Sequence, residues 1–110
     1  MNGWGRRRRY VYAYDVRDLR TYGQPVVGYV GKTSSHPSYR DRQHRDEKLW
    51  ARQIVGPQRI VWAGDCGRIA LWVREVYYIR RMKPLFNVEH NRRNPHRIQP
   101  WRVRDLYGRL

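Results

Sequence analysis

A few polar side chains in this chain have the types and spacing that phosphodiester chemistry needs. The run Tyr29-Val30-Gly31-Lys32 offers a tyrosine and a lysine, and Arg40 and His44 follow it four residues apart. Further on come Glu75 and the run Lys83-Pro84-Leu85-Phe86-Asn87, which ends in an amide. Together they supply a carboxylate for a metal, cations for a phosphate, a tyrosine for a proton and an amide to orient the rest. A site that cleaves phosphodiesters uses these parts.

The overall charge points to a polyanionic partner. The formal net charge is +15, and only three of the 24 basic residues are lysines, which leaves 21 arginines. The planar guanidinium of arginine suits bidentate contacts with phosphate. Because aromatic residues make up a further 14% of the chain, we expect nucleic acid as the partner, most simply DNA. Charge does not separate DNA from RNA, and a basic surface that only contacts solvent is the alternative.

Composition also excludes several classes of protein. A chain of 110 residues predicts one domain with a modest core. Cys66 is the single cysteine, which excludes an intrachain disulfide and a cysteine-based zinc cluster. The apolar stretches end early, at Asp15 and at Arg74, so we expect no signal peptide and no membrane span. We expect a cytoplasmic protein.

Hydrophobic patterning predicts the α+β class, with a small three-stranded antiparallel sheet flanked by helices. Strands are expected over residues 10–16, 26–30 and 59–63, where β-branched and aromatic residues gather between turn signals. The first two should form a hairpin. Helices are expected over about 38–48, 67–82 and, as shorter elements, 50–55 and the end of the chain. The first helix is charged nearly all round, so we expect it at the surface, packed through Tyr39 and Leu49.

The longest predicted helix carries the most informative acid. Asp65 is its expected N-cap, and its buried stripe is predicted from the apolar positions Ile69, Trp72, Val73, Val76, Ile79 and Met82. Glu75 falls at the margin of this stripe. A carboxylate there costs free energy unless it is paired or holds a metal, and the chain has only three glutamates.

The two ends of the chain are predicted to be basic extensions of the domain. Residues 1–9 form an expected arm whose arginines Arg6, Arg7, Arg8 and Arg9 would follow the phosphate backbone. Residues 89–110 form a second extension, with Arg92 and Arg93 as further phosphate contacts. The nuclease-like core would then occupy residues 10–88.

Order and spacing of the motifs resemble the GIY-YIG nucleases over residues 10–88. Tyr29-Val30-Gly31 stands for the second tripeptide of that family. Tyr10-Val11-Tyr12 stands for the first, with Tyr12 in the tyrosine place and Tyr10 where the family has glycine. Lys32 also fits, since some members carry lysine directly after the second tripeptide.

The remaining positions of the resemblance lie on the two longer helices and after them. Arg40 matches the essential arginine of the family, and His44 the residue one turn later. Glu75 matches the metal-binding glutamate, and Asn87 the asparagine that closes the site. The resemblance therefore implies that Tyr12, Tyr29, Arg40, His44, Glu75 and Asn87 form the catalytic site, with Lys32 as a substrate contact.

The mechanism that the resemblance implies is hydrolysis with one metal ion. Glu75 would hold a Mg²⁺ or Mn²⁺ ion that contacts the scissile phosphate. Tyr29 would accept a proton from the attacking water, provided that the cations Lys32 and Arg40 favour its phenolate. Arg40 would also neutralise charge in the transition state. Tyr12 and His44 would orient the water or the phosphate, and His44 is a competing base.

Other interpretations of the same residues remain. The tyrosines could be ordinary strand aromatics, Arg40 and His44 a solvated helix face, and Asn87 a turn residue. A nucleic-acid-binding module without activity, or a ribonuclease, would have a similar composition. With no further DNA-binding domain in view, specificity would come from the basic ends, a homodimer or a partner protein, as in a nuclease of a phage or mobile element.

Overall fold

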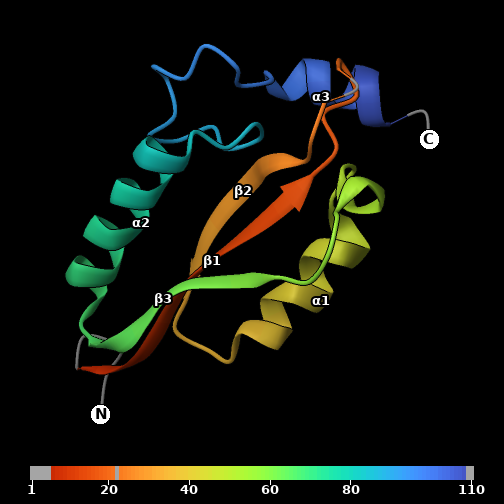
Figure 1. Ribbon diagram of the computed structural model, residues 1–110. Helices are drawn as coiled ribbons and strands as arrows, with labels where there is room; N and C mark the ends of the chain where they lie inside the picture. Colours follow the sequence, from red (N-terminus) through yellow and green to blue (C-terminus); the bar gives the residue numbers. More distant parts are fainter. Residues whose placement is uncertain (1–5, 22, 109–110) are drawn as a thin grey trace.

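The computed structural model describes residues 6–21 and 23–108, and it confirms the predicted α+β class with a three-stranded antiparallel sheet flanked by helices (Figure 1). Its elements in chain order are β1 (Arg7–Val16), β2 (Val26–Thr33), α1 (Pro37–Glu47), the short 3₁₀ helix η1 (Ala51–Gln53), β3 (Arg59–Cys66), α2 (Arg68–Met82) and α3 (Pro100–Tyr107). The sheet order is β2-β1-β3, so β1 is central and β2 is an edge strand. Within the described residues no helix is long and apolar enough to cross a membrane.

The central strand β1 divides the core into two layers because its side chains alternate between the two faces of the sheet. Val11 and Ala13 pack with Leu71 and Ile79 of α2 on one face. On the other face the even-numbered residues of β1 pack with residues that follow α1 and α2 and with one residue of α3. This cluster comprises Tyr12, Tyr14, Val16, Trp50, Leu85, Phe86, Ile98 and Tyr107. Figure 1 shows α2 and α1 on opposite sides of the sheet.

The orientation of α2 differs from the prediction. Ile79 is buried as predicted, but Ile69, Trp72 and Val73 are exposed, at 73%, 47% and 53%, and Leu71, which was not predicted, is buried. At about 100° per residue, Leu71 and Ile69 lie on nearly opposite sides of the helix, so they cannot both face the sheet. The helix carries apolar residues on both sides, and the buried face is the one that fits Val11 and Ala13.

Several predicted boundaries and contacts are corrected by the structure. Asp65 lies in β3 rather than at the start of α2, whose N-cap is Gly67. Helix α1 begins with Pro37 in its first turn, as expected, after the N-cap His36. Tyr39 and Leu49, 73% and 49% exposed, do not anchor this helix, whose buried residues are Pro37 and His44.

The segment after residue 88 belongs to the same packed unit and is not an appended extension. Ile98 and Tyr107 are buried in the core cluster that contains Tyr12. The Tyr107 hydroxyl donates to the Arg17 carbonyl at 3.0 Å and accepts from the Leu19 amide at 3.1 Å. These bonds fasten α3 to the loop between β1 and β2.

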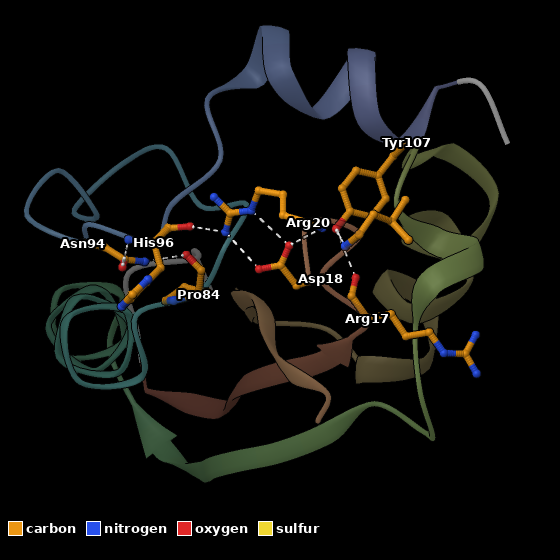
Figure 2. Close-up of polar contacts among 8 residues, drawn as sticks. Arg17, Asp18, Arg20, Pro84, Asn94, His96 and Tyr107 are labelled. Carbon is orange, nitrogen blue, oxygen red and sulfur yellow. Dashed lines mark hydrogen bonds and ion pairs between the residues drawn. The ribbon is translucent and has the colours of Figure 1, made fainter. Parts of the chain in front are cut away.

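A second attachment of the C-terminal segment passes through Arg20 (Figure 2). Arg20 pairs with Asp18 at 2.9 Å and donates to the His96 carbonyl at 2.8 Å. The Ile98 amide donates to the Leu85 carbonyl at 2.7 Å. Since the chain is held at both Leu85 and the β1–β2 loop, the segment that follows α2 is fixed against the sheet.

Candidate active site

The core of the candidate site begins with a close approach between β1 and β2. Tyr12 pairs with Gly31 across the two strands, and a Cβ atom on Gly31 would lie 2.5 Å from Cζ and Oη of Tyr12. Glycine at this position therefore allows the Tyr12 ring to lie over the neighbouring strand. The Tyr12 hydroxyl then reaches Nε2 of His44 at 2.6 Å. The close approach of the Tyr12 ring therefore explains why glycine is the third residue of the Tyr-Val-Gly tripeptide.

Tyr12 and His44 are both buried, with exposures of 0% and 3%. Burial, together with the cations Arg40 and Lys48, lowers the pKa of His44 to about 4, so the imidazole is neutral near pH 7. Burial also raises the pKa of Tyr12, which keeps its hydroxyl protonated. Among the described residues, Nδ1 of His44 has no hydrogen-bond partner. A buried, neutral pair of this kind positions its neighbours and does not meet solvent.

The other predicted site residues line an open groove of about 450 Å³ along the edge strand β2. They come from three elements and the segment after α2, and they are Tyr29, Lys32, Arg40, Glu75 and Asn87. Lys48 and Glu89 also line the groove, although neither was predicted. Tyr12 and His44 lie behind Tyr29, whose ring centroid is 6.5 Å and 5.1 Å from theirs. Five predicted residues thus share the groove, and two support it from the core.

Asn87 has a defined structural task at the free edge of β2. The amides of Leu85 and Phe86 donate to the carbonyls of Val27 and Gly28, so this segment runs along the strand. The Asn87 side chain continues the pairing: its Oδ1 accepts from the Val30 amide at 2.9 Å and its Nδ2 donates to the Val30 carbonyl at 2.8 Å. This explains the Pro-x-x-Asn spacing, because proline ends the helix and three residues then bond to the strand in succession. Asn87 positions the groove wall.

Glu75 projects from α2 into the groove and pairs with Lys32 of β2. Its Oε1 lies 2.9 Å from the Lys32 ammonium, and its side chain is 14% exposed. The pairing agrees with the expectation that a glutamate at the edge of the buried face needs a partner. Lys32 occupies one carboxylate oxygen, which leaves Oε2 as the available donor for another cation.

The donor set in the groove fits a magnesium-like ion with few protein ligands. Mg²⁺ commonly binds through one or two carboxylates, with water and substrate phosphates completing its shell. Glu75 provides one carboxylate, and Glu89 places a second one on the same groove. No cluster of three or more His, Cys, Asp or Glu side chains suited to a metal occurs in the described parts of the chain. A zinc-type site built from protein ligands alone is therefore not available there.

The pKa of Tyr29 is raised, whereas a role as base requires that its phenolate be favoured. Burial and the negative charge of Glu75 raise the pKa of Tyr29, and Arg40 opposes this only in part. The condition set for Tyr29 as a base, that Lys32 and Arg40 favour its phenolate, is not met in the protein alone, because burial and Glu75 outweigh Arg40 and Lys32 pairs with that carboxylate. The Tyr29 ring stacks on Trp50, with centroids 5.5 Å apart, which fixes its direction.

Arg40 is half-buried at the groove and is held from two sides. Its Nη1 donates to Oε1 of Gln43 at 2.7 Å, and interaction with the Tyr12 hydroxyl raises the pKa of the guanidinium. Because the guanidinium is already held in place, it can bind a phosphate without the entropy cost of ordering a flexible side chain. Gln43, three residues after Arg40 on α1, was not predicted from the sequence.

The predicted basic arm is partly incorporated into the sheet. Arg7, Arg8 and Arg9 lie in β1, Arg6 precedes it, and residues 1–5 of the predicted arm lie outside the described residues. Arg9 is fully buried: its Nε donates to the Cys66 carbonyl at 2.8 Å and its Nη1 to the Ser34 hydroxyl. The prediction of a phosphate contact by Arg9 is therefore wrong, while Arg6, Arg7 and Arg8 are exposed.

Arg92 and Arg93 are exposed as well, but they line a different cleft from the one that contains Tyr29 and Glu75.

No protein-family model, no curated protein and no solved structure matches this chain. The geometry of the groove therefore carries the functional argument.

Proposed function

We propose that the protein is a metal-dependent endonuclease that hydrolyses phosphodiester bonds in nucleic acid, most simply DNA, by GIY-YIG-type chemistry. The observation that carries the proposal is the convergence of Tyr29, Arg40 and Glu75 on one open groove, from β2, α1 and α2. These three residues are far apart in the sequence and differ in chemistry. A cation, a proton carrier and a carboxylate facing the same space form a set that phosphoryl chemistry uses.

The residues of the groove divide the work. Arg40 would contact a non-bridging phosphate oxygen and neutralise the charge that grows in the transition state. Tyr29 is the tyrosine that reaches the groove, so it would orient the attacking water and accept its proton. Tyr12 and neutral His44 would hold the Tyr29 side of the groove from behind. Asn87 would keep the edge of β2 in place.

Glu75 is the residue proposed to hold Mg²⁺ or Mn²⁺, and such an ion would supply a Lewis acid for the phosphate and the leaving 3′ oxygen. Lys32 would then pair with the phosphate in place of Glu75. The part of the raised pKa of Tyr29 that comes from Glu75 would be cancelled once that carboxylate holds a cation. Burial, the larger cause, would still raise the pKa of Tyr29, so a cation on Glu75 would offset only the contribution of that carboxylate.

The test is the substitution Glu75→Gln, which keeps the size of the side chain and removes its charge. We expect this variant to lose Mg²⁺-dependent cleavage of plasmid DNA while it still binds DNA in EDTA. Glu47→Gln, at the exposed C-terminal end of α1, is the matched control and should cleave normally. Cleavage that Glu75→Gln retains in Mg²⁺ would refute the proposal.

The substrate is separated by comparing plasmid DNA, single-stranded DNA and RNA in parallel, each with Mg²⁺ and with EDTA. We expect metal-dependent cleavage of DNA. Cleavage confined to RNA would replace DNA with RNA as the substrate, whereas binding to all three without cleavage of any would support a binding module.

A further inference from the structure

A second cleft, of about 670 Å³, lies beside the C-terminal end of α2. Four exposed cationic side chains line it, from α2, its C-cap and the loop that follows: Arg80, Lys83, Arg92 and Arg93. No acidic residue of the described chain is among its lining residues. Cations near a helix C-terminus are common because they complement the helix dipole, which would account for Arg80 and Lys83. Arg92 and Arg93 come from the loop and need another explanation.

The backbone of this cleft is held in an unfavourable conformation at two positions. Lys83 has φ of 50° and His90 has φ of 60°, and no other non-glycine residue in the described ranges has positive φ. Glycine adopts this left-handed conformation without the steric cost that a side chain brings, and it is the usual residue after a helix. Both strained residues line the same cleft. Strain of this kind is concentrated at binding sites, where the side chain has a use.

The loop that carries the cations is fixed to the segment that contains Asn87. Buried Asn91 donates through Nδ2 to the carbonyls of Pro84 and Asn87, at 2.7 Å and 2.8 Å. Buried Asn94 donates to the same Pro84 carbonyl at 3.1 Å, and its Oδ1 accepts from the His96 amide (Figure 2). The cleft is therefore pre-organised, and it shares one loop with the wall of the active groove.

An exposed aromatic ring borders the cleft. Trp72 of α2 is 47% exposed and meets the ring of His90 edge to face, with centroids 5.7 Å apart. Trp72 lies away from the face of α2 that packs on the sheet, and nearly half of its surface is open to solvent. An indole beside a row of cations is an arrangement that proteins use to bind single-stranded nucleic acid, with bases stacked on the ring and phosphates on the cations.

We propose that this cleft binds a single-stranded stretch of the nucleic acid next to the bond that is cut. Arg92, Arg93 and Lys83 contact successive phosphates, and Trp72 stacks on a base. The inference rests on the proposed function in two respects: it takes nucleic acid as the ligand, and it takes the neighbouring groove as the place of cleavage. It adds that the substrate has an unpaired segment, such as a flap, a bubble or a loop, beside the scissile phosphate.

Binding of a fluorescent 12-nucleotide oligothymidylate by the full chain, in EDTA and at several salt concentrations, tests the electrostatic part. The double variant Arg92→Gln/Arg93→Gln should lower the slope of log K against log[salt] by about 1.4 units, from two lost phosphate contacts on a single strand. The matched control removes two exposed arginines of α3, Arg102→Gln/Arg104→Gln. An equal change in both variants would mean that only diffuse charge acts, which would overturn the proposal.

Lys83→Gly separates a binding role from a folding role. Glycine suits the left-handed backbone at this position, so we expect the melting temperature to stay the same or rise. The affinity for the oligothymidylate should nevertheless fall, with a loss of about 0.7 in the salt slope. A variant with unchanged affinity would show that Lys83 contacts no phosphate and would count against the cleft.

Trp72→Ala tests the stacking part. It should weaken binding of the oligothymidylate about fivefold or more and leave binding of a blunt duplex unchanged, because paired bases are not available to the indole. Trp101→Ala, which removes a 69% exposed tryptophan from α3, is the control and should change neither. Equal losses on single strand and duplex would overturn the assignment of Trp72.

These measurements use neither metal nor cleavage, so they fail separately from the proposed activity. If the protein cleaves DNA normally but the cleft variants bind the oligothymidylate as the wild type does, the proposal for the cleft is refuted and the proposed nuclease activity is not. If the cleft variants selectively lose single-strand binding but the wild-type protein cleaves no substrate, the proposed nuclease activity is refuted and the proposal for the cleft is not.

Discussion

Gly31→Ala should be among the most damaging small substitutions in this protein, for a reason that the geometry makes explicit. The added methyl carbon would lie 2.5 Å from both Cζ and Oη of Tyr12 and 2.9 Å from Cε1. The ring cannot move away freely, since Tyr12 is fully buried and its hydroxyl is bonded to His44 at 2.6 Å. Either the strands separate or the hydrogen bond is lost.

The size of the effect follows from these two costs. Overpacking a well-filled core costs about 1–3 kcal/mol, and leaving a buried polar group without its partner costs about 1–3 kcal/mol. We therefore expect Gly31→Ala to lower the free energy of unfolding by about 1–3 kcal/mol if one cost applies and by about 2–6 kcal/mol if both do, measured by urea denaturation followed by far-UV circular dichroism. Cleavage should fall in parallel, because the groove depends on Tyr12 and His44 behind it.

Two further variants make this prediction specific. Gly23→Ala is the matched control, because a Cβ there would meet nothing closer than 3.9 Å, and it should change stability by less than about 0.5 kcal/mol. In a Tyr12→Phe background the cost of Gly31→Ala should shrink, since the hydroxyl that clashes is gone and the ring is no longer held by His44. If Gly31→Ala were as mild as Gly23→Ala, or if its cost were the same with and without the Tyr12 hydroxyl, the steric account of the tripeptide would be refuted.

Three other predictions follow from the site and its surroundings. Burial lowers the pKa of His44 to about 4, so as the pH falls the unfolded chain takes up this proton before the folded chain does. The contribution of His44 to the free energy of unfolding should therefore be complete above pH 6.5 and decrease towards pH 4, by up to about 1.4 kcal/mol per pH unit. The decrease should be steeper in the wild type than in His44→Gln. Equal pH slopes would contradict this. Arg9→Gln should lower the free energy of unfolding in urea by about 1–3 kcal/mol and leave the salt dependence of DNA binding unchanged. Arg8→Gln should leave the free energy of unfolding unchanged and reduce the salt dependence of DNA binding. Tyr29→Phe should lower kcat far more than it changes KM, and a near-normal kcat would show that Tyr29 does not take the proton.

The sheet and its three strands could be predicted because alternation is a local signal. Tyr10 to Val16 alternates between the two faces, and the structure confirms this with Val11 and Ala13 on one side and Tyr12 and Tyr14 on the other. The start of β1 at Arg7 could not be predicted, since a run of arginines resembles a solvated arm. Arg9 is buried, and Cys66 and Ser34, both distant in sequence, accept hydrogen bonds from it.

The orientation of α2 shows where periodicity fails. Apolar residues lie on two sides of this helix, so the pattern alone does not decide which side is buried. The choice depends on the fit of Leu71 and Ile79 to the sheet, a property of the assembled core. Glu75 was predicted at the margin of the buried face, but it lies in line with buried Leu71 and Ile79, where its carboxylate pairs with Lys32.

The membership of the site was more predictable than its electrostatics. Tyr29, Arg40, Glu75 and Asn87 line one groove, and their joint role in catalysis, which the resemblance implied, stays a prediction. The contribution of Glu89 could not be inferred, because nothing local distinguishes it from other charged residues. The direction of the pKa shift of Tyr29 also depends on burial and on the balance between nearby charges, which only the folded chain defines.

The edge strand β2 links these observations. An edge normally exposes unpaired amide and carbonyl groups that invite aggregation, and proteins cover such edges. Here the chain covers the edge with Leu85, Phe86 and the side chain of Asn87, and it pairs with β2 only as far as Val30. A full fourth strand would continue past Lys32 and fill the space between α1 and α2 where the groove lies. Ending the pairing with a side-chain amide satisfies the backbone and leaves the groove open, so the asparagine is needed for the shape of the site even if it never touches the substrate.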